Sequence, residues 1–133
     1  MLQFTRGGTT ITLDPLMEPP RPPLNPRAYE RTLVNRWAGL STTSEGRNAG
    51  RPVTFASTNR SGFVTREQAE ALIALYEQGG GLTITTDLLR PHGSTPQAYA
   101  AVFAPGNPPM FPPVTPDGTL YAFDMSFLIQ GEL

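Results

Sequence analysis

The sequence predicts a mainly β domain that contains a single α-helix. One segment, residues 66–78, has helical periodicity together with start and stop signals, while runs before and after it alternate apolar and polar residues. The 15 prolines and 13 glycines exceed average usage, so turns and extended loops must occupy much of the chain. A length of 133 residues suits a single domain, residues 1–133, with one hydrophobic core.

The N-terminal segment predicts a β-hairpin followed by a proline-rich arm. Leu2–Thr5 and Thr9–Leu13 flank Gly7-Gly8, and paired glycines supply the positive φ values that tight hairpin turns need. Residues 14–26 then carry proline at six of thirteen positions. Because proline lacks a backbone donor, this segment cannot lie in the centre of a sheet. We expect a semi-rigid arm of polyproline II type that is either a linker or lies on a neighbouring subunit.

The next segment, Arg27–Leu40, is compatible with both helix and strand. Its apolar residues recur with helical spacing after Asn25-Pro26, a favourable helix start, but they also fit an extended ribbon and include several strand formers. Residues 41–50 are polar and contain glycine, so we expect a mobile loop there. Arg51–Ala56 alternates again and predicts a half-buried strand.

The helix predicted for residues 66–78 has a defined beginning and end. Thr65 is placed to cap its N-terminus, and Gln68, three residues later, completes the capping-box pattern. Three glycines, 79–81, end the helix, because glycine readily takes the left-handed conformation that follows a helix C-terminus. The residues that should pack on a sheet, from their helical spacing, are Ala69, Leu72, Ile73 and Tyr76.

The C-terminal half predicts three further strands separated by loops. Leu82–Thr86 and Ala98–Phe103 alternate apolar and polar residues, with a loop at 89–97 between them. Residues 104–118 form a second proline-rich loop, which ends in turn-favouring residues. The closing run, Thr119–Gln130, is the longest, and one of its faces is wholly apolar, as in a strand that crosses the core.

The composition argues against catalysis. The chain has no cysteine, and its one histidine, His92, lies in a loop of Pro, Gly and Ser, so we expect no metal site and no cofactor. The carboxylates show no paired spacing of the kind used in acid–base hydrolysis, although a distant pair could meet in the fold. Glycines 79–81 follow a helix, whereas a phosphate cradle would open one. We therefore predict that the protein is not an enzyme.

Charge and hydropathy restrict the partners that the sequence predicts. A net charge of −1 argues against binding nucleic acid through a basic field. No apolar run has the length of a signal peptide core or a membrane span, so we expect no membrane insertion and folding in a cytoplasm.

All ten basic residues are arginine, whose planar guanidinium suits bidentate pairing at interfaces, although a solvated polar surface would account for the same residues. The residues that we predict at a subunit interface are Arg21, Arg27, Arg31, Arg36, Glu45, Arg47 and Arg51. Their candidate partners in a neighbouring copy are Glu30, Glu45, Glu67 and Glu77.

The order of elements resembles that of small tail-tip proteins of long-tailed, non-contractile bacteriophages. The likeness rests on Gly50–Val53, on the helix and its glycine stop, on Leu82–Ile84 and on the closing strand. It extends from residue 27 to the C-terminus and looks most like the N-terminal domain of distal tail proteins and the lambda-type minor tail proteins. It implies a tail-tube-like β-sandwich or split barrel with one helix, and it favours strand over helix for Arg27–Trp37.

The resemblance also implies a function. Domains of this kind close into a hexameric ring that continues the tail tube, so we expect a structural subunit of a virion tail that is assembled in the host cytoplasm. The implied partners are further copies of the chain, the tube protein, the tail-tip hub and the tape-measure protein, with DNA only in transit through the lumen. Two alternatives remain, namely the major tail-tube protein itself, or a small carbohydrate- or peptide-binding β-sandwich with an exposed aromatic platform.

Overall fold

The computed structural model describes residues 1–14, 17–23, 32–36, 39–43, 50–58, 62–91 and 93–133, and the side chains of all of these except residues 32–43. Within them the chain is mainly β with one α-helix, as the sequence predicts. The elements are β1 (Leu2–Arg6), β2 (Thr9–Leu13), β3 (Thr32–Arg36), β4 (Gly39–Thr43), β5 (Arg51–Ala56), β6 (Val64–Thr65), α1 (Arg66–Gln78), β7 (Leu82–Thr86), β8 (Gln97–Phe103), β9 (Leu120–Tyr121) and β10 (Asp124–Glu132).

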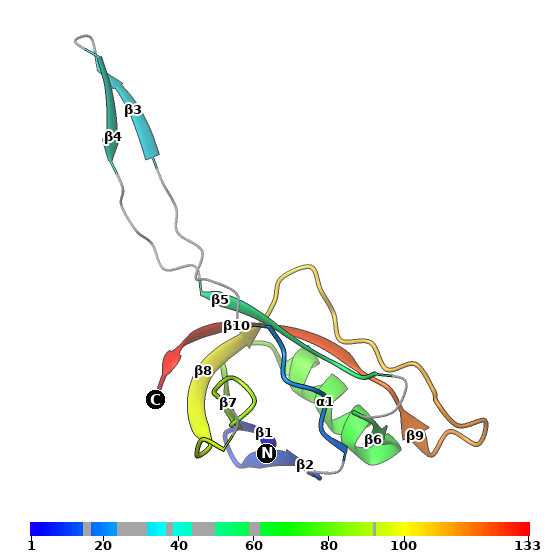
Figure 1. Cartoon of the computed structure of the whole chain (residues 1–133). Coiled ribbons are helices and arrows are strands. Elements are labelled where there is room, and N and C mark those ends of the chain that lie inside the picture. Colours follow the sequence, from blue (N-terminus) through cyan, green and yellow to red (C-terminus); the bar gives the residue numbers. More distant parts are fainter. Residues whose placement is uncertain (15–16, 24–31, 37–38, 44–49, 59–61, 92) are drawn as a thin grey trace.

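A six-stranded antiparallel sheet forms the centre of the molecule, with the strand order β2-β1-β7-β8-β10-β5. The sheet curves around α1, which covers its inner face (Figure 1). The predicted hairpin is confirmed, since β1 and β2 pair from Leu2↔Leu13 to Arg6↔Thr9 across Gly7-Gly8. Two small pairs, β3–β4 and β6–β9, are separate from this sheet.

Alternation along the strands sends large apolar side chains to the inner face. The ring of Phe127 is central there, with ring centroids 5.6 Å from Phe4, 6.0 Å from Phe55 and 4.7 Å from Phe103. Phe4, Phe55 and Phe127 are fully buried. Burying one such side chain stabilises a fold by about 1.5–3 kcal/mol, so this aromatic cluster is a major source of the stability of the sheet.

Both ends of α1 are capped. Thr65 Oγ1 accepts the backbone N–H of Gln68 at 3.3 Å, and Gln68 Oε1 accepts that of Thr65 at 3.0 Å, which confirms the capping box. At the C-terminus the Arg6 guanidinium donates to the carbonyl oxygens of Leu75, Gly80 (2.8 Å) and Gly81 (3.1 Å). Leu75 belongs to the last turn of α1, where carbonyls have no intrahelical donor, and Gly80 and Gly81 follow the helix directly. Arg6 therefore links the first hairpin to the end of the helix.

The predicted packing face of α1 is wrong at one position. Ala69, Leu72 and Leu75 are buried, whereas Ile73 is 38% exposed. The row at i±3 around Leu72 meets the sheet, and Ile73, turned by a further 100° around the helix axis, lies outside it. Tyr76 is half-buried, with its ring edge-on to Phe103 at 5.2 Å.

The predicted closing strand Thr119–Gln130 is two strands. β9 pairs with β6, and β10 begins only at Asp124. Between them Phe123 is buried, and its backbone N–H donates to Ser57 Oγ at 2.7 Å while its carbonyl accepts the Ser57 N–H at 2.8 Å. These bonds draw the backbone out of the straight path that continuous pairing would require.

The strand favoured within Arg27–Leu40 is present at Thr32–Arg36. Residues 27–31 lie outside the described part of the chain. The loop predicted for residues 41–50 is wrong at its first three positions, because Ser41–Thr43 belong to β4 and pair with β3. The loop was predicted from the polarity of these residues, although threonine is a favourable strand residue. Residues 44–49 lie outside the described part of the chain.

The described part of the proline-rich arm, residues 17–23, docks on its own domain. Arg21 Nη1 donates to the carbonyl oxygens of Asp87 (2.6 Å) and Arg90. Pro19 is buried beside Gly62, where a side chain would come within 3.1 Å of the Pro19 Cα atom. Gly62 also has a φ of +85°, so only glycine suits this contact. The described part of the arm is therefore held on its own domain and is not a bare linker; contact of the arm with a neighbouring subunit stays a prediction.

Candidate functional site

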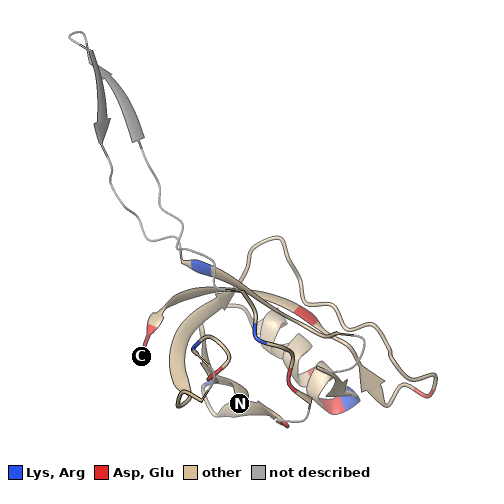
Figure 2. Cartoon of the chain, viewed as in Figure 1, with Lys and Arg blue, Asp and Glu red and all other residues tan. Residues whose placement is uncertain are grey.

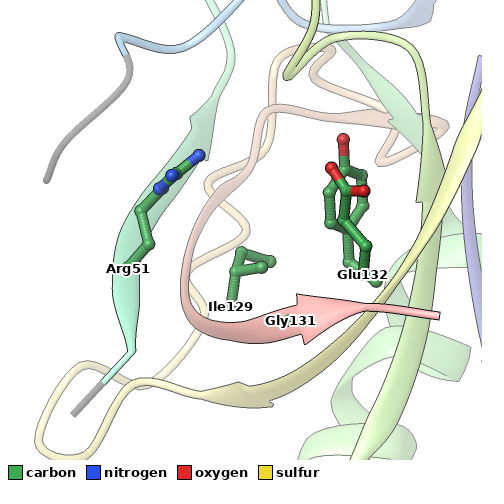
Figure 3. Close-up of a pocket in the computed structure, with 5 residues that line it drawn as sticks. Arg51, Ile129, Gly131 and Glu132 are labelled. Atoms are coloured by element: carbon green, nitrogen blue, oxygen red, sulfur yellow. The ribbon is translucent and has the colours of Figure 1, made fainter. Parts of the chain in front are cut away.

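A hollow with charged walls lies at one end of the inner face, where β5, β8 and β10 run side by side (Figure 3). Its volume is about 210 Å³, and its lining residues are Arg51, Tyr99, Ile129, Gly131 and Glu132. Arg51 stands on one wall and Glu132 on the opposite wall, with Ile129 and Gly131 between them (Figure 3). The hollow thus presents unlike charges across an apolar floor.

A β-bulge in β10 places Glu132 in this hollow. Ile129 pairs with Ala101, but the next partners are Gly131↔Ala100 and Glu132↔Tyr99, so one extra residue enters β10. In an uninterrupted strand, Glu132 would share the outer face with Leu128 and Gln130. The bulge turns it to the side of Tyr99 instead, which is a common use of bulges.

Neither charge of the hollow is neutralised by a neighbour in the part of the chain that the structure describes. Among the described residues, the side chains of Arg51 and Glu132 make no hydrogen bond and no ion pair. Burial raises the pKa of the Tyr99 hydroxyl, and the nearby Glu132 carboxylate raises it further, against the opposing charges of Arg90 and Arg51. Tyr99 therefore remains a neutral hydroxyl that can donate or accept a hydrogen bond.

The polar groups that line this hollow are suited to binding a charged or polar partner group. It offers five guanidinium donors, a carboxylate acceptor and a phenol, but it has no nucleophile paired with a base of the kind that covalent catalysis needs. In the described part of the chain, no group of three or more His, Cys, Asp or Glu side chains could hold a metal ion. A partner group that carries both charges, or a donor and an acceptor, would satisfy both walls.

Of the predicted interface residues whose side chains the structure describes, only Arg51 lines this hollow. Arg21 lies elsewhere, on the carbonyls of Asp87 and Arg90. Arg36 is the last residue of β3, where only the backbone is described. The predicted interface residues outside the described part of the chain are Arg27, Arg31, Glu45 and Arg47. An interface role for all seven residues stays a prediction.

Besides Arg51, the two polar residues of the hollow were not predicted as site residues from the sequence. Tyr99 reads as one more apolar residue of an alternating strand, and Glu132 lies beyond the run that ends at Gln130. The only local sign is Gly131, because a glycine inside a strand often marks a bulge. That sign does not say which side chain the bulge redirects.

Comparison of the chain with protein-family models, with curated proteins and with solved structures finds no match. No helix in the described part of the chain is long and apolar enough to cross a membrane. The function must therefore be inferred from the residues and their arrangement.

Proposed function

We propose that the chain is a structural subunit that associates with copies of itself into a ring at the distal end of the tail tube of a long-tailed bacteriophage. In this role DNA passes through the lumen of the ring, and the neighbouring proteins are the tube, the tail-tip hub and the tape measure. The identity of the particle rests on the resemblance in element order, and self-assembly rests on the observations below.

The hairpin formed by β3 and β4 carries the proposal of assembly. The two strands pair over Thr32↔Thr43 to Arg36↔Gly39, and neither hydrogen-bonds to the six-stranded sheet (Figure 1). An isolated two-stranded hairpin is at best marginally stable in water. Contacts with another subunit would supply the stabilisation that the hairpin lacks within its own sheet.

The outer face of the sheet is compatible with a surface that other molecules cover or pass. Charged residues are scarce along the central strands in Figure 2, and on β10 they are confined to Asp124 and Glu132 at its two ends. The outward residues of β7, β8 and the middle of β10 are Thr83, Thr85, Ala98, Ala100, Val102, Ser126, Leu128 and Gln130. A face without basic residues would not hold DNA by release of counterions, which suits DNA in transit.

The described aromatic residues do not favour the carbohydrate-binding alternative. That alternative requires an exposed aromatic platform, but the described Phe and Tyr side chains are all buried or half-buried. The pairs of rings contact one another in the core, as for Phe4 with Phe127.

Electron microscopy and analytical ultracentrifugation of the purified chain, over a range of concentrations, test the proposal. Closed rings are expected. Long tubes would identify the major tail-tube protein instead, because that protein stacks ring upon ring. A chain that stays monomeric, alone and with purified tail tubes, would contradict the proposal.

A further inference from the structure

Two surfaces of this chain complement each other in charge. The first is the hollow between Arg51 and Glu132, whose floor is Ile129. The second is a row of exposed residues on α1, which we call the α1 stripe. It consists of Arg66, Glu70, Ile73 and Glu77.

The α1 stripe follows helix geometry. Its residues are spaced i, i+4, i+7 and i+11, which places them on one side of a helix. Arg66, Glu70 and Ile73 line a common depression with Phe111. Ile73 is one of only a few large apolar residues in the described chain that are more than a third exposed. The stripe therefore presents a cation and an anion, then an apolar side chain, then a second anion.

Glu77 is unfavourable for the stability of its own helix. It lies in the last turn of α1, where the partial negative charge of the terminal carbonyls repels a carboxylate. No basic residue of the helix lies in that turn. Arg6 binds the terminal carbonyls, but no ion pair joins Arg6 and Glu77 in the described part of the chain. A guanidinium from another molecule would offset this repulsion.

We propose that copies of the chain associate head to tail, with the α1 stripe of one copy seated on the hollow of the next. Glu77 then binds Arg51, Ile73 covers Ile129, and Arg66 binds Glu132. Such a contact joins two different surfaces, and contacts of that type close into rings when the rotation between copies permits. The inference rests on the proposed function, since it names the contact through which the ring is built.

The spans of the two surfaces are close enough for their side chains to meet. Along the helix, the Cα atoms of Arg66 and Glu77 are about 16 Å apart at 1.5 Å per residue. Arg51 lies opposite Ile129 on the neighbouring strand and Glu132 follows three residues later, so their Cα atoms are on the order of 11 Å apart from strand spacing and rise. The long side chains of arginine and glutamate can span the difference.

The groups at each end also have bonding capacity to spare. Arg66 donates from Nε to Glu70 at 3.1 Å, so its two terminal nitrogens remain for Glu132. The hollow, at about 210 Å³, is below the roughly 300–1,000 Å³ of small-molecule pockets. It is therefore better suited to the ends of a few side chains than to a separate ligand.

Charge reversal tests this contact. Arg51→Glu alone and Glu77→Arg alone should each weaken self-association about tenfold or more in the dissociation constant, because each brings like charges together. The double variant restores an attractive pair and should recover most of the wild-type affinity. Asp124→Arg is the control, because it makes the same charge change at an exposed position at the other end of β10, outside both surfaces, and should leave association nearly unchanged.

Crosslinking gives a second readout that does not depend on affinity. The chain has no cysteine, so Arg51→Cys combined with Glu77→Cys introduces a single reactive pair. A short bis-maleimide should join these variants into a ladder of oligomers, while either single-cysteine variant should stop at dimers.

The outcomes separate this inference from the proposed function. If the wild type forms rings that neither reversal weakens and no ladder appears, this contact is wrong and the ring proposal stands. If the wild type stays monomeric under all conditions, both are rejected. Rings that both reversals weaken and the double variant restores would support both.

Discussion

The two faces of the six-stranded sheet are formed by the same strands, yet they carry different side chains and have different roles. The inner face buries large apolar side chains, with Phe127 at the centre of an aromatic cluster. On the outer face the same strands carry short, mostly uncharged side chains such as Thr83, Ala100 and Ser126. One face therefore stabilises the fold, and the other can be committed to contacts outside the domain without loss of the core.

The largest expected effect comes from the centre of the inner face. Phe127→Ala should lower the free energy of unfolding by about 3–5 kcal/mol, because it removes three ring contacts and leaves a cavity. Leu128→Ala, the next residue along β10, lies on the outer face and should cost well under about 1 kcal/mol, as surface substitutions usually do. Urea unfolding of both variants measures the difference, and equal losses would contradict the division of the faces.

A second effect is expected where the inner face reaches the end of α1. Arg6 continues the inward row of Leu2 and Phe4 and donates to three carbonyls at the helix C-terminus. Arg6→Met keeps the aliphatic stem and should cost about 2 kcal/mol, as charged hydrogen bonds contribute roughly 1.5–3 kcal/mol. Arg66→Met is the control.

Arg66 makes only an exposed i,i+4 ion pair with Glu70, so Arg66→Met should cost about 0.5 kcal/mol or less. Thermal unfolding of the two variants under one buffer condition compares them. A loss at Arg6 as small as that at Arg66 would show that Arg6 acts as an ordinary surface charge.

A smaller loss of stability is expected at Thr86, a polar residue on the otherwise apolar inner face. Thr86 is fully buried and is the one buried polar side chain among the described residues; its Oγ1 accepts the N–H of Leu88 at 3.0 Å. Thr86→Val keeps the shape but leaves that N–H without its acceptor, which should cost about 1–2 kcal/mol. Thr85→Val, on the outer face, should be close to neutral. Hydrogen exchange at the Leu88 amide would report the loss directly.

The division of the faces also explains what the sequence could predict. Alternation predicted the strands β5, β7, β8 and β10, because a half-buried strand repeats every two residues. It could not show the bulge that turns Glu132 inward, since a bulge depends on pairing between distant strands. Ile73 was misassigned for a related reason: helical spacing defines a broad face, but only the position of the sheet decides which edge of that face is buried.

The smallest expected effect is a pH dependence at the edge of the inner face. The Met1 α-ammonium donates to Asp87 at 2.7 Å and to Glu18 at 2.9 Å. Burial lowers the pKa of this ammonium, but the bonds to Asp87 and Glu18 outweigh burial and raise it above 8.0. The bond from the ammonium, stronger than the opposing effect of burial, lowers the pKa of Asp87 below 3.8.

These two shifts define a window of stability. The raised ammonium pKa adds stability that is fully present below pH 8.0 and is lost as the pH rises through the folded-state value. The lowered Asp87 pKa adds stability that is present above pH 3.8 and is lost as the pH falls through its folded-state value. The stability of the wild type minus that of Asp87→Asn should therefore be largest between these limits and shrink on both sides. Because both groups are partly exposed, the difference should be small and should decrease with added salt. A difference that stays constant from pH 3 to pH 10 would show that Asp87 acts through packing alone.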